Sequence, residues 1–268
     1  TEPEVAVPAL IESGVQYIRA GGAAGPALDA GIPNDDVAPW LRQLQDSGIK
    51  LGVVLFLQNK AISSERFIEK AQVLKDSGYY DWIMLDSMRR IRPELQEIID
   101  ALHDMGWEKV MLNTSPWADV KGKKKQTAPL PTGIWAYATM FHSLTREYVP
   151  DENDALVQAD IDFVAKIHQK FPDSLAVLKF EIPWQMGRFE QEPRAKQEQL
   201  LTLWAEGQQR ENYVMIYPLF TGSSAGREPR DYDALEAGTW DRQMELIKKY
   251  NETLSNTNKC TGFDAGGE

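Results

Sequence analysis

The sequence predicts an α/β fold of the TIM type, a (β/α)8 barrel. Short apolar runs alternate along the 268-residue chain with stretches whose apolar residues recur about every 3.6 positions. The runs are rich in Val, Ile, Leu, Tyr and Trp and mostly do not alternate with polar residues, as in parallel strands that are buried on both faces. Successive runs lie about 30 residues apart, which is the length of a βαβ unit. The seven predicted strands are Val15–Ala20, Leu51–Leu57, Asp81–Asp86, Lys109–Asn113, Ile134–Phe141, Leu175–Glu181 and Tyr213–Phe220.

The stretches between the strands carry helix signals at both ends. Asp35-Asp36 and Ser63-Ser64 stand where an N-cap is expected, and Pro93 stands where the first turn of a third helix should begin. A glycine follows each of these stretches, as at many helix ends. The predicted buried faces are Val37, Trp40, Leu41 and Leu44; Phe67, Ile68, Ala71 and Leu74; and Leu95, Ile98, Ile99 and Leu102. Further helices are expected at 154–171, 193–210 and 235–254.

A doubly wound sheet would also alternate strands and helices, but a barrel suits so many regular units better. The chain also lacks the Gly-x-Gly-x-x-Gly turn of dinucleotide-binding sheets. Glu4–Pro8 is a weak candidate for the eighth strand, so the barrel is expected to be irregular or to lack one strand at its seam. We expect one domain over residues 1–268, with 251–268 as a flexible tail rich in Asn, Thr and Gly.

Composition narrows the class of partner. The net charge of -11 disfavours nucleic acid, and the basic run Lys121–Lys125 is interpreted as a solvated loop. No apolar run is long enough to span a membrane. The single cysteine, Cys260, allows no internal disulfide. Because the chain opens on Thr1 rather than Met, a removed export signal is conceivable, and we expect a secreted or cell-surface protein with a cytoplasmic one as the alternative.

Two carboxylates follow otherwise apolar strands. In α/β barrels the carboxyl ends of the strands carry the working site, so Asp86 and Glu181 are candidate catalytic residues. A pair of carboxylic acids suits glycoside hydrolysis, in which one protonates the leaving oxygen and the other acts as nucleophile or base. Because the two strands are not neighbours, we expect the wider separation of inverting enzymes, about 6.5–9.5 Å. The structural alternatives are a cap or an ion pair with Arg89 or Arg90 for Asp86, and an ion pair with Lys179 or Arg19 for Glu181.

Other polar and aromatic residues at the strand ends would bind substrate. Trp117 and Trp184 each follow a strand end and would stack on sugar rings, although a hydrophobic lid is an equal alternative. The other predicted substrate-binding residues are Arg19, Asn113, Lys179 and Tyr217. Lys179 also permits a minor alternative, a lyase that forms a Schiff base on a strand lysine. No spacing of His, Cys or Asp indicates zinc, and we expect neither a metal nor a cofactor.

Four stretches carry a family resemblance over roughly residues 15–142. They are Arg19–Pro26, Ser47–Val54, Tyr80–Ser87 and Val110–Ser115, in matching order and spacing. The series resembles the spherulin-4-like proteins and related barrel glycosidases that cleave galactosaminogalactan-type polymers. By this resemblance Asp86 matches the first catalytic-site aspartate of the family. The chain departs from the family at Ser87, where a glutamate is common, and in Ala136–His142, which contains no acid.

Three functional hypotheses follow. The leading one is a glycoside hydrolase of an extracellular or cell-surface polysaccharide, using Asp86 and Glu181. The second is a catalytically inactive carbohydrate-binding barrel, because the family's other acids are missing. The third is the Schiff-base lyase or aldolase that uses Lys179. In the first two the partner is a carbohydrate.

Overall fold

A computed structural model describes a large part of the chain. It describes residues 3–12, 16–57, 62–87, 93–113, 129–140, 162, 165–179, 214–218 and 262–264. The chain forms two compact units, residues 2–139 and 140–267, which are described separately below.

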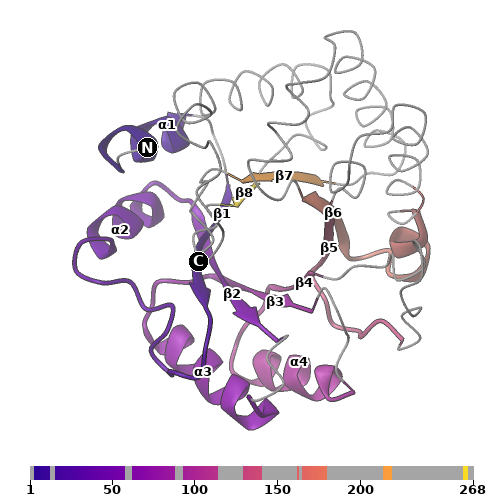
Figure 1. The fold of residues 1–268 in the computed structure, drawn as a ribbon. Coiled ribbons are helices and arrows are strands. Elements are labelled where there is room, and N and C mark those ends of the chain that lie inside the picture. The colour runs from indigo at the N-terminus through magenta and orange to yellow at the C-terminus, as the bar shows by residue number, and fades with distance from the viewer. Residues whose placement is uncertain are drawn as a thin grey trace, which may run out of the picture. The chain divides into compact units, whose positions relative to one another are not determined.

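The first unit is a parallel sheet with helices on one side (Figure 1). Register pairs join β1 to β2, β2 to β3, β3 to β4 and β4 to β5, all in the parallel sense. The strands are β1 Tyr17–Ala23, β2 Lys50–Phe56, β3 Trp82–Asp86, β4 Val110–Asn113 and β5 Ala136–Met140, and the helices are α1 Pro3–Glu12, α2 Ala38–Asp46, α3 Ser64–Asp76 and α4 Leu95–Asp104. The strand predictions are therefore confirmed to within a few residues at each end.

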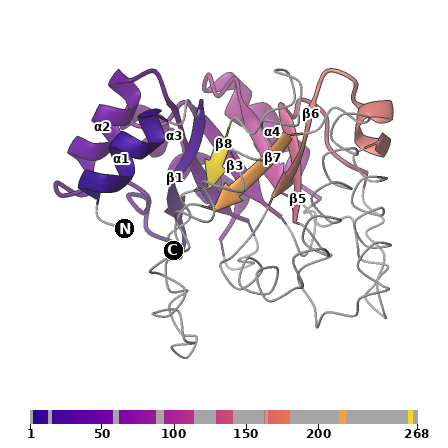
Figure 2. The same cartoon turned by 90° about the horizontal axis from the view of Figure 1, so that it is seen from above.

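The strands are buried on both faces, as their apolar sequences predict. Val53, Leu55 and Leu85 are fully buried on one face, and Val54 and Met84 are almost fully buried on the other. The first face packs against the helices, because a side chain at Gly31 would contact both Ala23 of β1 and Leu74 of α3. In Figure 2, α1, α2 and α3 all lie on the same side of β1.

The helix ends differ in detail from the prediction. Ser63 caps α3 as expected, and its hydroxyl accepts a hydrogen bond from the backbone N–H of Arg66 at 3.3 Å. At α2 the cap predicted from Asp35-Asp36 is wrong. The N-cap residue is Val37, and no side chain caps the helix there. In the turn before the helix, Oδ1 of Asn34 accepts from the N–H of Val37 at 3.0 Å, and Val37 is 42% exposed rather than buried. The predicted face of α4 (Leu95, Ile98, Ile99 and Leu102) is fully buried or nearly so.

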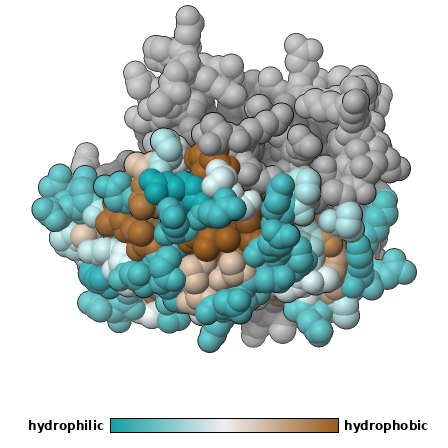
Figure 3. Space-filling model, turned by 90° about the horizontal axis from the view of Figure 1, so that it is seen from below, coloured by the Kyte–Doolittle hydropathy of each residue, from teal (hydrophilic) through white to brown (hydrophobic). Residues whose placement is uncertain are grey.

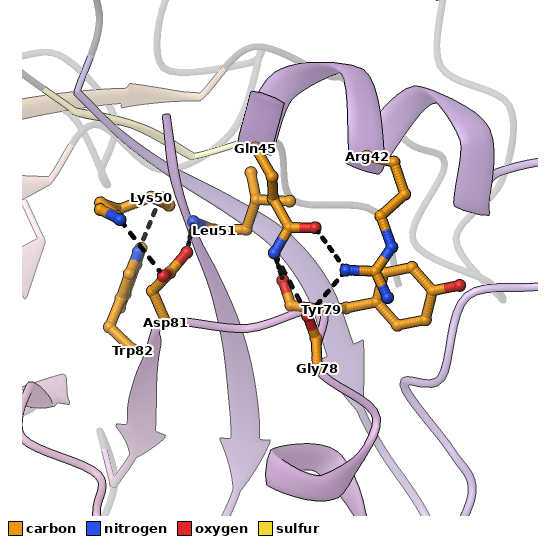
Figure 4. A network of polar contacts seen from close by, with 8 residues as sticks. All are labelled: Arg42, Gln45, Lys50, Leu51, Gly78, Tyr79, Asp81 and Trp82. Carbon is orange, nitrogen blue, oxygen red and sulfur yellow. Dashed lines mark hydrogen bonds and ion pairs between the residues drawn. The ribbon is translucent and has the colours of Figure 1, made fainter. Parts of the chain in front are cut away.

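A polar network ties the amino-terminal ends of β2 and β3 to α2 (Figure 4). Asp81 accepts a hydrogen bond from the backbone N–H of Leu51 at 2.9 Å and lies 3.6 Å from the ammonium group of Lys50. From α2, Arg42 donates to the carbonyl of Gly78 at 2.9 Å, and its guanidinium group lies 4.1 Å from the centre of the Tyr79 ring. These contacts lie at the end of the sheet opposite the strand ends that were predicted to carry the site.

The second unit contains three short parallel strands. They are β6 Leu175–Lys179, β7 Val214–Pro218 and β8 Gly262–Asp264, joined in this order. The first two confirm the prediction. The eighth strand was predicted wrongly, because Glu4–Pro8 lies in helix α1, and β8 lies instead within the segment predicted to be a tail. The predicted helices at 193–210 and 235–254 lie outside the described residues.

Eight strands in chain order, parallel in every described pair, make this an α/β fold of the TIM-barrel type, as predicted. Among the described residues no helix is both long and apolar enough to cross a membrane. Val37 is the large apolar residue that is exposed in the described part of the chain. Seen from below, the described surface is mostly hydrophilic, with apolar residues between the hydrophilic ones (Figure 3).

Candidate functional site

Asp86 and Asn113 are neighbours at the carboxyl ends of β3 and β4. They form a register pair in the parallel ladder, so their side chains leave the sheet on the same face. The backbone on both sides is fixed by further strand-like bonds. Leu57 donates its N–H to the carbonyl of Asp86 at 3.0 Å, and Ser87 donates its N–H to the carbonyl of Asn113 at 2.9 Å.

This face is the one turned away from the helices. Ala23, which lies on the helix side, belongs to the register row of Leu55 and Leu85, one residue before the row of Asp86. Alternate residues of a strand point to opposite faces, so Asp86 points away from the helices. Its row across the sheet is Phe56, Asp86, Asn113 and Ala138. The row therefore places two polar side chains together between an aromatic residue and a small one.

Both polar side chains of the row are buried. Asp86 is 7% exposed and Asn113 is fully buried. Neither Nδ2 nor Oδ1 of Asn113 has a hydrogen-bond partner among the described residues. A buried amide without partners costs about 1–3 kcal/mol of stability, so a leucine would be the more stable residue here. Such a cost is expected where a side chain is kept to bind a ligand.

Arg19 is on the same face but further from the strand ends. It pairs with Gly52 of β2, which pairs with Trp82 of β3, four residues before Asp86. A register shift between Arg19 and Gly21 interrupts the ladder on β1. The structure therefore does not place Arg19 beside Asp86 and Asn113, although sequence spacing had grouped the three.

The other predicted site residues lie on β6 and β7 of the second unit or outside the described residues. Lys179 is the last residue of β6 and pairs with Ile216, and Tyr217 of β7 pairs with Phe263. Both backbones therefore lie near carboxyl ends of strands, as predicted. Glu181, Trp117 and Trp184 lie outside the described residues, as does the basic run Lys121–Lys125.

Lys70 of α3 is a feature that the sequence prediction missed. It is 1% exposed, and its ammonium group donates to the carbonyl of Gly25 at 2.7 Å. Burial lowers the pKa of Lys70, the nearby Arg66 lowers it further, and Asp29 opposes both effects. The signal was present in the sequence, because Lys70 lies three residues after Phe67 and four before Leu74, on the apolar stripe of the helix.

The described residues contain no group of three or more His, Cys, Asp or Glu side chains that could hold a metal ion.

Comparison with known proteins extends the fold assignment. No protein-family model and no curated protein matches the sequence. Solved structures do match. The endoglucanase Cel5A of Pseudomonas stutzeri gives a TM-score of 0.57 at 13% identity, over 96% of this chain and 86% of that one. The endo-beta-1,4-glucanase Xac0029 of Xanthomonas axonopodis pv. citri gives 0.50 at 8% identity, over 90% of both chains.

The N-terminal domain of an aldolase-like protein from Bacteroides vulgatus gives a TM-score of 0.51 at 14% identity, over 93% of this chain and 78% of that one. Glycosidases and an aldolase-like barrel thus resemble this chain to a similar degree. At such low identities the likeness shows the fold, and the chemistry must be argued from the residues. The chain is similar in fold to TIM-barrel enzymes that include endoglucanases.

Proposed function

We propose that this chain is a glycoside hydrolase of an extracellular or cell-surface polysaccharide. The observation that carries the proposal is the buried pair of Asp86 and Asn113 on one face at the carboxyl ends of β3 and β4. In barrels of this type that end carries the chemistry. A carboxylate beside an amide that has no hydrogen-bond partner among the described residues offers a hydrogen-bond acceptor and donor to the hydroxyl groups of a sugar.

The second acid of the mechanism is Glu181. It follows the last residue of β6 by two positions in the sequence. In the proposal one of the two carboxylic acids protonates the glycosidic oxygen, and the other activates water or attacks the sugar carbon. Trp117 and Trp184 would supply the stacking surfaces, and Lys179 and Tyr217 would orient the sugar.

The position after Asp86 supports this choice of second acid. Spherulin-4-like barrels often carry a glutamate there, whereas this chain has Ser87, which is 1% exposed. A spherulin-4-like hydrolase with this substitution must take its second acid from another strand, and the next candidate is Glu181.

Two polymers test the proposal, and the release of reducing ends is the readout. A soluble β-1,4-glucan represents the substrates named for the endoglucanases of similar fold, and an α-1,4-linked galactosamine polymer represents the spherulin-4-like resemblance. We expect the wild-type protein to cleave one of them. Asp86→Asn and Glu181→Gln should each lower kcat by about 10²–10⁴-fold, the usual contribution of an acid or base.

A matched control comes from the same strand region. Asp81→Asn changes a carboxylate at the amino-terminal end of β3, among the contacts of Figure 4, and should leave kcat within about twofold. Full activity of Asp86→Asn, or no cleavage of either polymer by the wild type, would refute the hydrolase.

The two alternatives predict other results. An inactive carbohydrate-binding barrel would bind one of the polymers in calorimetry without releasing reducing ends, and Asn113→Ala would weaken the binding. The lyase alternative is favoured by Lys179 at the end of β6. Borohydride reduction in the presence of pyruvate would then leave a covalent adduct on Lys179, and a protein without that adduct is not this lyase.

A further inference from the structure

The loop between β1 and α2, residues 24–37, is held by side chains from outside it. Lys70 of α3 donates to the carbonyl of Gly25 at 2.7 Å, and Arg66, one turn earlier, donates from Nε to the carbonyl of Pro26 at 3.3 Å. Tyr80, just before β3, donates its hydroxyl to the carbonyl of Gly31. Three donors from two other segments therefore fix the loop at both of its halves.

The loop also packs closely against the strand it follows. Gly31 has a φ of +94°, a conformation that favours glycine, and a Cβ there would lie 3.1 Å from the Cβ of Ala23 and 3.3 Å from the carbonyl oxygen of Gly22. The hydroxyl of Tyr80 occupies the space that a side chain at Gly21 would need. A side chain at either glycine would therefore clash with its neighbours, so the loop and β1 are packed too closely for any residue larger than glycine at these positions.

The loop begins at the level of the candidate site. Ala23 ends β1 and pairs with Leu55, which directly precedes Phe56 in the row of Asp86. Residue 24, the first residue of the loop, therefore lies where the row of Asp86 would continue onto β1. Loops at this end of the strands form the walls of ligand sites in α/β barrels.

Lys70 is a costly way to fill the core. Taking an ammonium group out of water is unfavourable, and an apolar residue of similar length would pack in the same place without that cost. The other buried positions of α3, Phe67, Ala71 and Leu74, are all apolar. The feature that distinguishes Lys70 is its bond to the loop.

We propose that Lys70 is a positioning residue that fixes the β1–α2 loop as a rigid wall at the same end of the sheet as Asp86 and Asn113, two strands away from Asp86. Arg66 holds the adjacent carbonyl, and Tyr80 holds the far half of the loop. The anchoring follows from the contacts alone. Its consequence for substrate rests on the proposed carbohydrate function.

Hydrogen exchange tests the anchoring in the full-length protein without any ligand. Lys70→Met should speed the exchange of amides 24–33, in which Pro26 and Pro33 carry no N–H, by at least about tenfold and leave amides 95–104 of α4 unchanged. Lys70→Arg keeps a charged donor and should restore most of the protection. Lys75→Met is the matched control, since Lys75 on the same helix donates to the carbonyl of Gly106 at 2.8 Å, away from the loop. Unchanged exchange of amides 24–33 in Lys70→Met would overturn the proposal.

A second variant tests the anchoring if Lys70→Met does not fold. Arg66 is more exposed, and Arg66→Ala should loosen the same amides by a smaller factor while the protein stays folded. If Lys70→Met does not fold and Arg66→Ala leaves amides 24–33 unchanged, the anchoring role is refuted.

Kinetics test the consequence with whichever of the two polymers the wild type cleaves. A misplaced wall should raise KM by about fivefold or more and leave kcat within about twofold, and Lys70→Arg should reverse the change. A fall in kcat with unchanged KM would contradict positioning. If the wild type cleaves neither polymer, the proposed function fails, and the exchange experiment still decides the anchoring.

Discussion

Asp86 and Asn113 form the last register pair of the parallel ladder of β3 and β4. Their backbones continue the ladder through the bond from the N–H of Ser87 to the carbonyl of Asn113. Their side chains are polar, although most of the buried residues around them are apolar. This contrast between a satisfied backbone and a polar, buried side-chain pair is what makes the pair a candidate site.

Replacing Asn113 by leucine should separate stability from function. Leucine has nearly the shape of asparagine but no polar atoms to leave unpaired, so Asn113→Leu should raise the free energy of unfolding by about 1 kcal/mol or leave it unchanged. The same change should abolish binding of the polymer that the wild type binds. Urea unfolding and calorimetry measure the two effects.

Asn113→Asp is the companion variant. It keeps a polar group but adds a second carboxylate opposite Asp86 on the neighbouring strand. Two carboxylates in such a register pair disfavour each other's ionised form. We expect it to be less stable than the wild type at neutral pH. A loss of stability in Asn113→Leu would instead mean that the amide has partners in the folded protein.

Asp81 should matter more to stability than its exposure suggests. Its carboxylate accepts from the N–H of Leu51, whose residue is fully buried, so Asp81→Ala leaves a backbone donor without that partner. We expect a loss of about 1–2 kcal/mol in urea unfolding. Lys50→Ala removes only the cation 3.6 Å away, which is 54% exposed, and should cost about 0.5 kcal/mol or less. Equal losses for the two variants would assign the effect to the ion pair instead.

The sequence predicted the strands well because each is a continuous apolar run between polar helices. β6 and β7 were found in this way as well. The eighth strand was missed for the opposite reason. β8 has only three residues, Gly262–Asp264, and a run that short carries no pattern.

Helix α1 shows why a local pattern can mislead. Glu4–Pro8 alternates apolar and small residues and contains a proline, which reads as an edge strand. Val7 and Leu10 are nevertheless both buried, three residues apart, and this is the spacing of a helix face.

The candidate site was predictable only up to the level of strand ends. Asp86 and Asn113 could be placed there because polar residues at the end of a buried strand are unusual. The depth of Arg19 could not be predicted, since it depends on the register shift between Arg19 and Gly21. The bond from Lys70 to Gly25 joins residues 45 positions apart and also has no local signal.

Gly52 should not tolerate a side chain. The ring of Trp82 lies directly over it, in the space that a Cβ would occupy. The centres of the Trp82 and Trp135 rings are 6.1 Å apart. Gly52→Ala should therefore displace the indole and cost about 1–3 kcal/mol. Near-ultraviolet circular dichroism and urea unfolding would detect both changes.

Gly48 offers the matched comparison for Gly52. A Cβ there meets nothing within 4 Å, but its φ of +86° is unfavourable for alanine. Gly48→Ala should cost about 1 kcal/mol and leave the aromatic dichroism unchanged. An unchanged aromatic spectrum in Gly52→Ala would contradict the packing of Trp82 on β2.

Stability should fall at alkaline pH because Tyr80 is buried. Burial raises the pKa of Tyr80 to about 12, and the neighbouring Tyr79 adds to the shift, whereas an unfolded tyrosine titrates near 10. A raised pKa in the folded state means that the unfolded chain releases this proton first. The stabilising contribution of Tyr80 is therefore complete below pH 10 and is lost as the pH rises from about 10 to about 12. A pKa of about 12 in the folded protein against about 10 in the unfolded chain corresponds to about 2–3 kcal/mol.

Tyr80→Phe isolates this effect from that of Tyr137, whose pKa burial also raises. At pH 9 the variant should be about 1 kcal/mol less stable than the wild type, because the bond from Tyr80 to the carbonyl of Gly31 is lost. As the pH rises to 11.5, ionisation of Tyr80 favours the unfolded state of the wild type, whereas the variant has no hydroxyl to ionise. The difference in the free energy of unfolding should therefore shrink and then reverse. Since Tyr137 is present in both proteins, its contribution cancels. Parallel loss of stability in the two proteins between pH 9 and 11.5 would show that the hydroxyl of Tyr80 ionises as freely when folded as when unfolded, and the far half of the β1–α2 loop would then lack its anchor.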